Sequence, residues 1–192
     1  MARIMFIVDS DFEDSEFRVP YDRVQQEGHE AVIVGLEAGK QLKGKKGKET
    51  IQAERAAKEV SAEEFDALVI PGGYSPDHLR ADSDMVELVR AFFESGKPVA
   101  AICHAGWMLA EADIIDGRTL TSWPSIKTDL INAGANWVDR EVVEDGNLIT
   151  SRKPDDLKAF SDALVRQIDQ GSAERLGEGA VMEMEEERPA VH

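Results

Sequence analysis

The chain has 192 residues, of which 42% are hydrophobic, and this is enough to build one domain around an ordinary core. Its 38 acidic and 22 basic residues give a formal net charge of -16, which repels phosphate backbones and anionic lipid headgroups. We therefore expect neither nucleic acid nor a membrane surface as a partner. No segment sustains the roughly 18 apolar residues that a membrane-spanning helix needs.

The N-terminus and the cysteine content bear on where the protein functions. The apolar stretch in "MARIMFIVDSDFED" is short and meets acidic residues rather than a cleavage site, so no export signal is visible. Cys103 is the only cysteine and cannot form an intrachain disulfide, so nothing here depends on an oxidising compartment. These features predict a soluble, cytoplasmic protein.

Short apolar runs alternate with amphipathic stretches along the chain. The first run, "RIMFIV", is continuous and contains β-branched residues, which is typical of a strand covered on both faces of a sheet. The predicted strands, all of this kind, are residues 3–8, 31–35, 67–73 and 98–103. The predicted helices, all amphipathic, are residues 14–27, 84–95, 104–111, 125–132 and 155–169. This alternation predicts a three-layer α/β sandwich with a mainly parallel sheet, where ligands bind beyond the carboxyl ends of the strands.

Some segments do not follow the alternation. The basic run "KGKKGK" at 43–48 is expected to be a solvated hairpin tip rather than a phosphate site. The stretch 51–60 is helical by propensity, but a hairpin leading into an extended segment fits it as well, and both interpretations stay open. After Gly171 the apolar periodicity ends and an acidic run follows. We therefore expect an α/β domain over residues 1–171 and a flexible acidic tail over 172–192.

The segment "VAAICHAGW" places Cys103 between a predicted strand and a predicted helix. A thiol on such a tight turn lies near the positive end of the helix dipole, which favours the thiolate. Ala105 and Gly106 are small enough to let strand and helix pack closely, as in a nucleophile elbow. A free cysteine is also often a buried core residue without chemistry. The neighbouring features favour the nucleophile.

Other loops at the same edge of the sheet carry candidate partners for the thiol. His104 either moves a proton for the thiol or bonds to backbone at the helix start. Gly72 and Gly73 directly follow a predicted strand, so they could turn backbone amides toward an oxyanion or form an ordinary turn. The acidic run "DSDFEDSE" could supply an acid or base, although most of its residues should be solvated or cap the next helix.

Five segments agree in order and spacing with one known family. They are "DFEDSE", "ALVIPGGYSPDHLR", "GKPVAAICHAGWMLA", "TSWPSIKTDLINAGANWVD" and "SRKPDDL". On these segments, roughly residues 2–170, the chain resembles the PfpI-type intracellular proteases, within the ThiJ/PfpI superfamily that also contains the Parkinson-associated deglycase. The resemblance implies a flavodoxin-like sandwich with a nucleophilic cysteine on the elbow, and a homodimer or higher homo-oligomer.

The same resemblance implies roles for individual residues. Cys103 corresponds to the family's nucleophile and His104 to its adjacent histidine. Glu13 corresponds to a glutamate whose carboxyl hydrogen-bonds the cysteine sulfur. Asp77 corresponds to a carboxylate that reaches the histidine of a neighbouring subunit. The oxyanion-binding backbone corresponds to Gly72, Gly73 and His104.

The predicted site fits several functions. The first is a cysteine-dependent hydrolase that acts on peptides or on the adducts of dicarbonyls such as methylglyoxal, in protection against stress, with no cofactor. The second is a non-catalytic sensor in which peroxide oxidises Cys103 and no second cysteine resolves the product. The third is a chaperone that uses exposed surface. A metal site of Cys103, His104 and Glu13 lacks the ligand spacing of a recognised motif, so no metal is expected.

Overall fold

The computed structural model describes residues 1–186 of the chain, and the side chains of residues 1–174. A seven-stranded sheet has the order β10-β11-β7-β6-β1-β2-β5 and is parallel except for the β10–β11 pair. Its strands are β1 (Arg3–Ile7), β2 (Glu30–Gly35), β5 (Arg55–Ala56), β6 (Ala67–Ile70), β7 (Val99–Ile102), β10 (Val143–Asp145) and β11 (Leu148–Ser151). The predicted α/β class with a mainly parallel sheet is confirmed.

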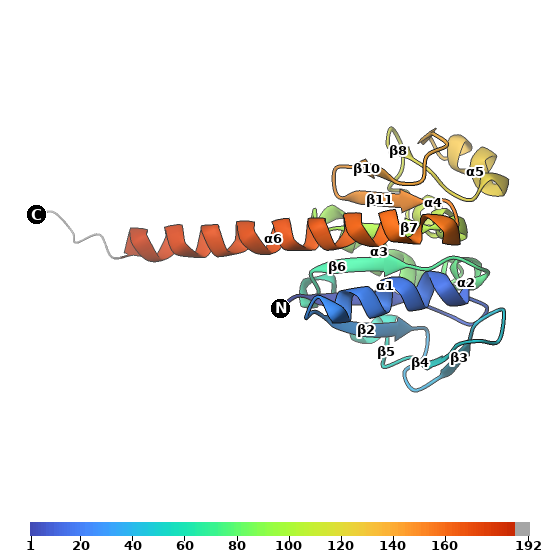
Figure 1. Cartoon of the computed structure of the whole chain (residues 1–192), viewed down its shortest axis with the longest axis horizontal. Helices are drawn as coiled ribbons and strands as arrows, with labels where there is room; N and C mark the ends of the chain where they lie inside the picture. The colour runs from blue at the N-terminus through green and yellow to red at the C-terminus, as the bar shows by residue number, and fades with distance from the viewer. Residues whose placement is uncertain (187–192) are drawn as a thin grey trace, which may run out of the picture.

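Helices cover both faces of this sheet. The helices of the chain's described part are α1 (Asp14–Gln26), α2 (Ser75–Leu79), α3 (Ser83–Glu94), α4 (Gly106–Glu111), α5 (Lys127–Asn132) and α6 (Leu157–Glu186). Figure 1 shows α1 and α6 in front of the sheet and α3 behind it. The result is the predicted three-layer sandwich. Among residues 1–186, no helix combines the length and the apolar character that a membrane span requires.

The core lies in two layers because successive side chains of a strand point to opposite faces. In β1, Ile4 and Phe6 pack into the layer that also contains Phe17 of α1 and Phe160 of α6. The alternate residues of β1 pack into the other layer, beside side chains of α3 and α4; they are Met5 and Ile7. Burial on both faces explains why the run at 3–8 is continuously apolar.

Two small sheets lie outside the main one. β3 (Gln41–Lys43) and β4 (Thr50–Gln52) form an antiparallel hairpin, and β8 (Thr119–Leu120) pairs in parallel with β9 (Asn136–Trp137). The hairpin predicted around the basic run is therefore present. The ambiguous stretch 51–60 is mostly extended, with β4, β5 and one 3-10 turn (Ala57–Glu59), so its helical propensity is overridden by strand pairing.

The last helix differs from its predicted length. The first residues of the predicted helix at 155–169 belong to a 3-10 turn (Pro154–Asp156), and α6 then begins at Leu157 and extends far beyond the sheet (Figure 1). Residues 170–186 contain no proline and several good helix formers, and their glycines cost only about 1 kcal/mol each in a helix. The end of the predicted tail, residues 187–192, lies outside the described residues.

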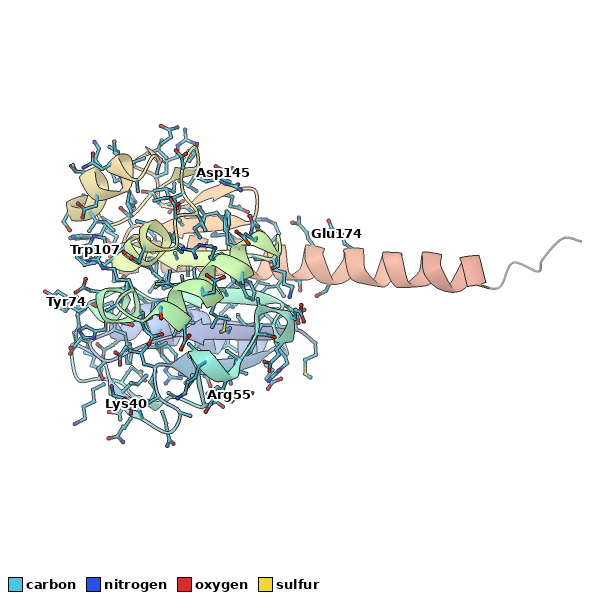
Figure 2. All side chains as sticks on the ribbon, turned by 180° about the vertical axis from the view of Figure 1, so that it is seen from behind. Lys40, Arg55, Tyr74, Trp107, Asp145 and Glu174 are labelled. Carbon is cyan, nitrogen blue, oxygen red and sulfur yellow. The ribbon has the colours of Figure 1, made fainter. Side chains whose placement is uncertain are left out.

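The loops after the parallel strands gather at one end of the molecule. Figure 2 shows Tyr74, after β6, and Trp107, after β7, at this end, and Glu174 of α6 at the opposite end. The segment after β1 reaches the same place, because Phe12 forms an isolated bridge with Gly73. The topology thus brings together the three loops that the sequence marks as candidates.

Candidate active site

Cys103 lies on a tight turn between β7 and α4, as predicted. It begins a 3-10 turn (Cys103–Ala105) and has a positive φ of 63°. Its residue surface is only 8% exposed. Close packing of the elbow also depends on Gly106, where a Cβ atom would lie 2.8 Å from Leu130 Cδ1. Gly106 therefore lets the start of α4 pack closely against α5, which is a different contact from the predicted packing of strand against helix.

The thiol is more deeply buried than the elbow pattern suggests. Burial, followed by the negative charge of ionised Glu16, raises the pKa of Cys103 to about 12. The backbone amides of His104 and Gly73 oppose this by donating toward the sulfur. The expectation of a thiol acidified by the helix dipole was thus wrong in direction, because desolvation exceeds what the amides supply.

Glu16 is the carboxyl group beside the thiol. It lies in the first turn of α1, is fully buried, and its Oε1 accepts a hydrogen bond of 3.0 Å from the Gly72 amide. Burial, followed by the charge of Glu13, raises the pKa of Glu16 to about 8. Glu16 therefore holds its proton through much of the neutral range, and a negative charge on Glu16 disfavours one on Cys103. The pair is suited to sharing a proton.

Gly72 and Gly73 have different tasks. A Cβ on Gly72 would lie 2.7 Å from Cys103 Cβ, and the Gly72 amide is used by Glu16. Gly73 has a φ of +78°, and its amide faces the sulfur together with that of His104. Of the predicted oxyanion backbone, Gly73 and His104 thus converge on the thiol, whereas Gly72 holds the neighbouring carboxyl group.

Glu13 lies in the same pocket but away from the role the resemblance implied. Its carboxylate is buried and accepts contacts from Lys45 Nζ at 3.1 Å and Lys46 Nζ at 2.8 Å. Burial alone would raise the pKa of Glu13, but Lys46 and Lys45 together outweigh it and lower that pKa. Glu13 precedes α1 and faces the β3–β4 hairpin, whereas Glu16 lies one turn later and faces the sheet. The structure therefore corrects the thiol-contacting residue from Glu13 to Glu16.

His104 bridges the thiol and the pocket wall. Its Nδ1 lies 3.3 Å from Cys103 Sγ, and its Nε2 lies 3.3 Å from Ser125 Oγ. Its ring stands 5.0 Å from that of Trp107, centroid to centroid. Burial, followed by the charge of Lys45, lowers the pKa of His104, so the imidazole is neutral near pH 7. A neutral imidazole in this place can accept a proton from the thiol or from water.

Asp77 is on α2 and forms no part of this pocket within one chain. Its Oδ1 accepts hydrogen bonds from Arg80 Nε at 2.9 Å and Nη2 at 2.6 Å, and about half of its side chain is exposed. Its predicted approach to the histidine of another subunit remains a prediction.

The pocket in front of the thiol has a volume of about 290 Å³. We call Cys103, Glu16 and Gly73 the pocket floor, and Glu13, Lys45 and Lys46 the pocket rim. The pocket is lined by Glu13, Glu16, Lys45, Lys46, Cys103, His104, Trp123 and Pro154. Its size is at the low end for ligand sites, which favours a small molecule or a single side chain.

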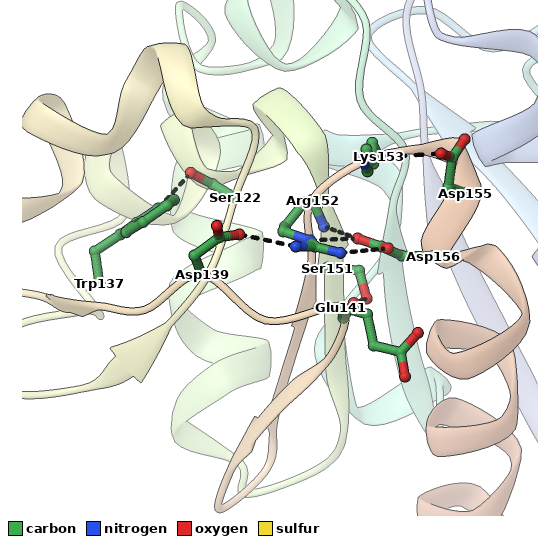
Figure 3. Close-up of polar contacts among 9 residues, drawn as sticks. All are labelled: Ser122, Trp137, Asp139, Glu141, Ser151, Arg152, Lys153, Asp155 and Asp156. Carbon is green, nitrogen blue, oxygen red and sulfur yellow. Dashed lines mark hydrogen bonds and ion pairs between the residues drawn. The ribbon is translucent and has the colours of Figure 1, made fainter.

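A polar network fixes the loop that brings Pro154 to the pocket. Figure 3 shows Arg152 between two carboxylates: its Nε and Nη2 donate to Asp156 at 2.9 and 3.0 Å, and its Nη1 donates to Asp139 at 2.8 Å. Asp156 is buried and also accepts from the Arg152 amide. The loop is thereby held by hydrogen bonds from both the guanidinium group and the backbone amide of Arg152.

The sequence reasoning missed Glu16, the two rim lysines and Ser125. Glu16 has a detectable signal, since it precedes Pro20 and Val24 by one and two turns on the buried stripe of α1. A carboxylate on an apolar stripe needs a specific partner. Lys45, Lys46 and Ser125 leave no such signal in the sequence, because their positions depend on how separate loops fold against each other.

Comparisons with known proteins agree with this architecture. "Protein/nucleic acid deglycase 2" of Escherichia coli (strain K12) is 47% identical over 165 residues, which cover 85% of this chain and 96% of that protein. A two-domain Anabaena variabilis protein with dj-1/thij/pfpi-like and ferritin-like domains superposes with a TM-score of 0.87 at 39% identity, over 90% of this chain and 50% of that one. Drosophila melanogaster DJ-1beta superposes with a TM-score of 0.80 at 29% identity, over 91% and 97%. Residues 2–167 match the model of the DJ-1/PfpI family. The chain therefore belongs to the DJ-1/PfpI family.

Proposed function

We propose that this protein is a cysteine-dependent deglycase, which removes small dicarbonyl adducts from amines or thiols. The observation that carries the proposal is the pairing of Cys103 with the protonated Glu16 at the floor of a pocket of about 290 Å³. The name of the E. coli relative, a deglycase, supports the same reaction class. Removal of such adducts would protect the cell under carbonyl stress.

The reaction follows from the groups in the pocket. In an adduct of methylglyoxal with an amine, one carbon carries the amine and a hydroxyl, and the next carbon is a ketone. Cys103 passes its proton to His104, and Sγ bonds to the carbinol carbon while the carbon–nitrogen bond breaks. The amine leaves with a proton from Glu16. The amides of Gly73 and His104 stabilise negative charge on the substrate oxygen.

The remaining steps restore the enzyme. A proton leaves the sulfur-bearing carbon, taken by the Glu16 carboxylate, and a proton joins the neighbouring carbon. The hydroxyl proton on the sulfur-bearing carbon moves to the ketone oxygen, so the ketone becomes an alcohol and the sulfur-bearing carbon becomes the carbonyl of a thioester. Water then adds to the thioester, the carbon–sulfur bond breaks, and lactate leaves while the thiol regains its proton. Adduct and water give free amine and lactic acid, so no external oxidant or reductant is required.

The test compares lactate and amine release from methylglyoxal-treated N-acetyl-lysine by the wild type and by Cys103→Ser. We expect release by the wild type and a loss of at least about 10³-fold in the variant, because serine is a far weaker nucleophile without a dedicated base. Free methylglyoxal in a parallel assay shows whether the enzyme acts on the adduct or only depletes the free dicarbonyl.

Two results would replace this proposal. Cleavage of a peptide panel by the wild type but not by Cys103→Ser, without lactate release, would assign an intracellular peptidase. Absence of both activities, together with rapid oxidation of Cys103 by peroxide, would assign the non-catalytic sensor.

A further inference from the structure

The basic run at 43–48 is built into the pocket rather than left in solvent. The tip of the β3–β4 hairpin wraps around the carboxylate of Asp14, which is buried. Asp14 accepts three backbone hydrogen bonds of 2.9 Å each from the amides of Lys46, Lys48 and Glu49. These bonds outweigh the effect of burial and lower the pKa of Asp14. The hairpin tip therefore has a fixed backbone conformation at neutral pH.

This conformation directs two lysines into the mouth of the pocket. Lys45 and Lys46 both contact Glu13 and both line the pocket that contains Cys103. Their side chains are 37% and 52% exposed, so their ammonium groups reach solvent in the pocket mouth. An ammonium group has three N–H donors, and among the described residues the ammonium group of each lysine is paired only with Glu13. Donors remain for a ligand.

The charge of the pocket is opposite to that of the whole chain. Among the residues that line the pocket, two lysines face one ionised glutamate, which leaves one net positive charge at the rim; the carboxylate of Asp14 also acts on Lys46 but does not line the pocket. At the floor, Glu16 and Cys103 hold their protons near pH 7, and the imidazole of His104 is neutral. The chain as a whole carries -16. A positive pocket on a negatively charged chain disfavours a polyanion, which the rest of the surface would repel. It favours a small anion, which would contact only the pocket.

We infer that Lys45 and Lys46 select substrates with a carboxylate or phosphate group, so that the substrates are small anionic carbonyl adducts. The inference rests on the proposed function for the reaction itself. The anion would bind between the ammonium groups at the rim while the carbonyl adduct reaches Cys103 at the floor. Trp123 and Pro154 line the same pocket and would contact the apolar part of the substrate.

Alkylation of Cys103 tests whether the rim lysines attract an anion, and this assay does not depend on catalytic turnover. Iodoacetate and iodoacetamide are both thiol-alkylating reagents, and they differ in one negative charge. We expect the ratio of their rates to fall about fivefold in Lys45→Gln/Lys46→Gln, since each lysine is partly solvated and shared with Glu13. A change in the thiol pKa cancels in the ratio. Lys48→Gln is the matched control from the same hairpin and should keep the wild-type ratio.

The single variants Lys45→Gln and Lys46→Gln each should show part of the effect, and circular dichroism verifies that every variant is folded. An unchanged ratio in the folded double variant would overturn the inference. So would an equal fall in Lys48→Gln, which would indicate a general surface effect.

Turnover with matched substrates links the rim to the reaction. Methylglyoxal adducts of N-acetylcysteine and of its amide differ only in the carboxylate, and adducts of guanosine monophosphate and guanosine differ only in the phosphate. We expect the wild type to favour the anionic member of at least one pair by about fivefold in kcat/KM, and the double lysine variant to lose this preference. The pair with the larger preference identifies the source of the anion.

The two proposals fail in different ways. Turnover of all four adducts without a charge preference would overturn the anion selection and leave the deglycase reaction standing. No turnover of any adduct, with a lysine-dependent alkylation ratio, would overturn the deglycase reaction and leave the anion site standing.

Discussion

Glu13 and Glu16 are identical side chains three residues apart, yet the pocket rim and the pocket floor give them opposite protonation states. At the rim, two lysine ammonium groups lower the pKa of Glu13. At the floor, burial raises the pKa of Glu16 to about 8, with one backbone amide as a partner for its carboxyl group. Both residues are buried, and burial acts to raise the pKa of each. At the rim the two ammonium groups outweigh burial, whereas at the floor burial prevails, and this difference separates an acid–base group from a binding group.

The largest effect should come from the floor, at the nucleophile itself. Cys103→Ala should lower adduct turnover at least about 10³-fold while leaving the fold intact, because the elbow already accommodates small residues. Lactate release measures the turnover, and thermal unfolding shows whether the fold is intact. Activity that survives in the folded variant would move the chemistry away from the floor.

Glu16→Gln separates thiol reactivity from proton transfer. Glutamine keeps the size of the side chain and its acceptor for the Gly72 amide, but it cannot take up or release a proton. We expect turnover to fall about 10²-fold while iodoacetamide still alkylates Cys103. Glu27→Gln, at the other end of α1, is the control. If Glu16→Gln turns over at the wild-type rate, the carboxyl group at the floor has only a structural role.

The variant Asp77→Ala tests whether a partner subunit contributes a residue to the pocket. Asp77→Ala should lower turnover about tenfold if its carboxylate orients the histidine of a neighbouring subunit in a homodimer. Mixing it with Cys103→Ala should restore part of the activity, because one site in the mixed dimer has both Cys103 and a partner's Asp77. Subunit exchange without recovery, or an active monomer, would leave Asp77 as the partner of Arg80 only.

The raised pKa of Glu16 also predicts how stability depends on pH. Below the ordinary value of 4.5, folded and unfolded chains both hold the proton, and the stabilising contribution is complete. As the pH rises from 4.5 to about 8, the unfolded chain releases a proton that the folded chain retains, so the free energy of unfolding falls. This contribution has a slope of up to ~1.4 kcal/mol per pH unit.

Urea unfolding across this pH range measures the slope. Glu16→Gln has no proton to lose there, so its stability should fall less steeply than that of the wild type and of Glu27→Gln. Equal slopes in all three proteins would mean that the floor carboxyl group titrates normally.

The smallest effect on the reactivity of Cys103 is expected from a substitution at the pocket rim. Glu13→Gln removes the negative charge that the two lysines share, so both ammonium groups become more available to an anion. The ratio of iodoacetate to iodoacetamide alkylation of Cys103 should rise about threefold, the opposite of the lysine substitutions. A fall in this ratio would show that Glu13 mainly holds the lysines in place.

Much of the fold could be predicted because its signals are local. Burial on both faces makes the parallel strands continuously apolar, so the run at 3–8 could be predicted as an inner strand of the sheet. The short β8–β9 pair and the β10–β11 hairpin were missed, since strands of two to four residues carry little pattern. The length of α6 was missed because a polar stretch without apolar periodicity was interpreted as a tail.

The site was predictable only in part. Cys103 and His104 are adjacent on one elbow, and the sequence around them predicts that elbow directly. The choice between Glu13 and Glu16 depends on where α1 begins and which face it buries, and a shift of one turn exchanges the two. Lys45 and Lys46 reach the pocket only because Asp14 binds the backbone of the hairpin tip. Such contacts between distant segments leave no periodic signal in the sequence.

The positive φ of Cys103 has an evolutionary consequence. A left-handed conformation is less stable by roughly 1–2 kcal/mol for a residue with a Cβ atom than for glycine. At a φ of 63°, the backbone of this residue would therefore gain from a change to glycine. A lineage that no longer needed the reaction would have no reason to keep the cysteine against that gain. Among homologous chains, the residue at this elbow should thus record whether selection still acts on the chemistry.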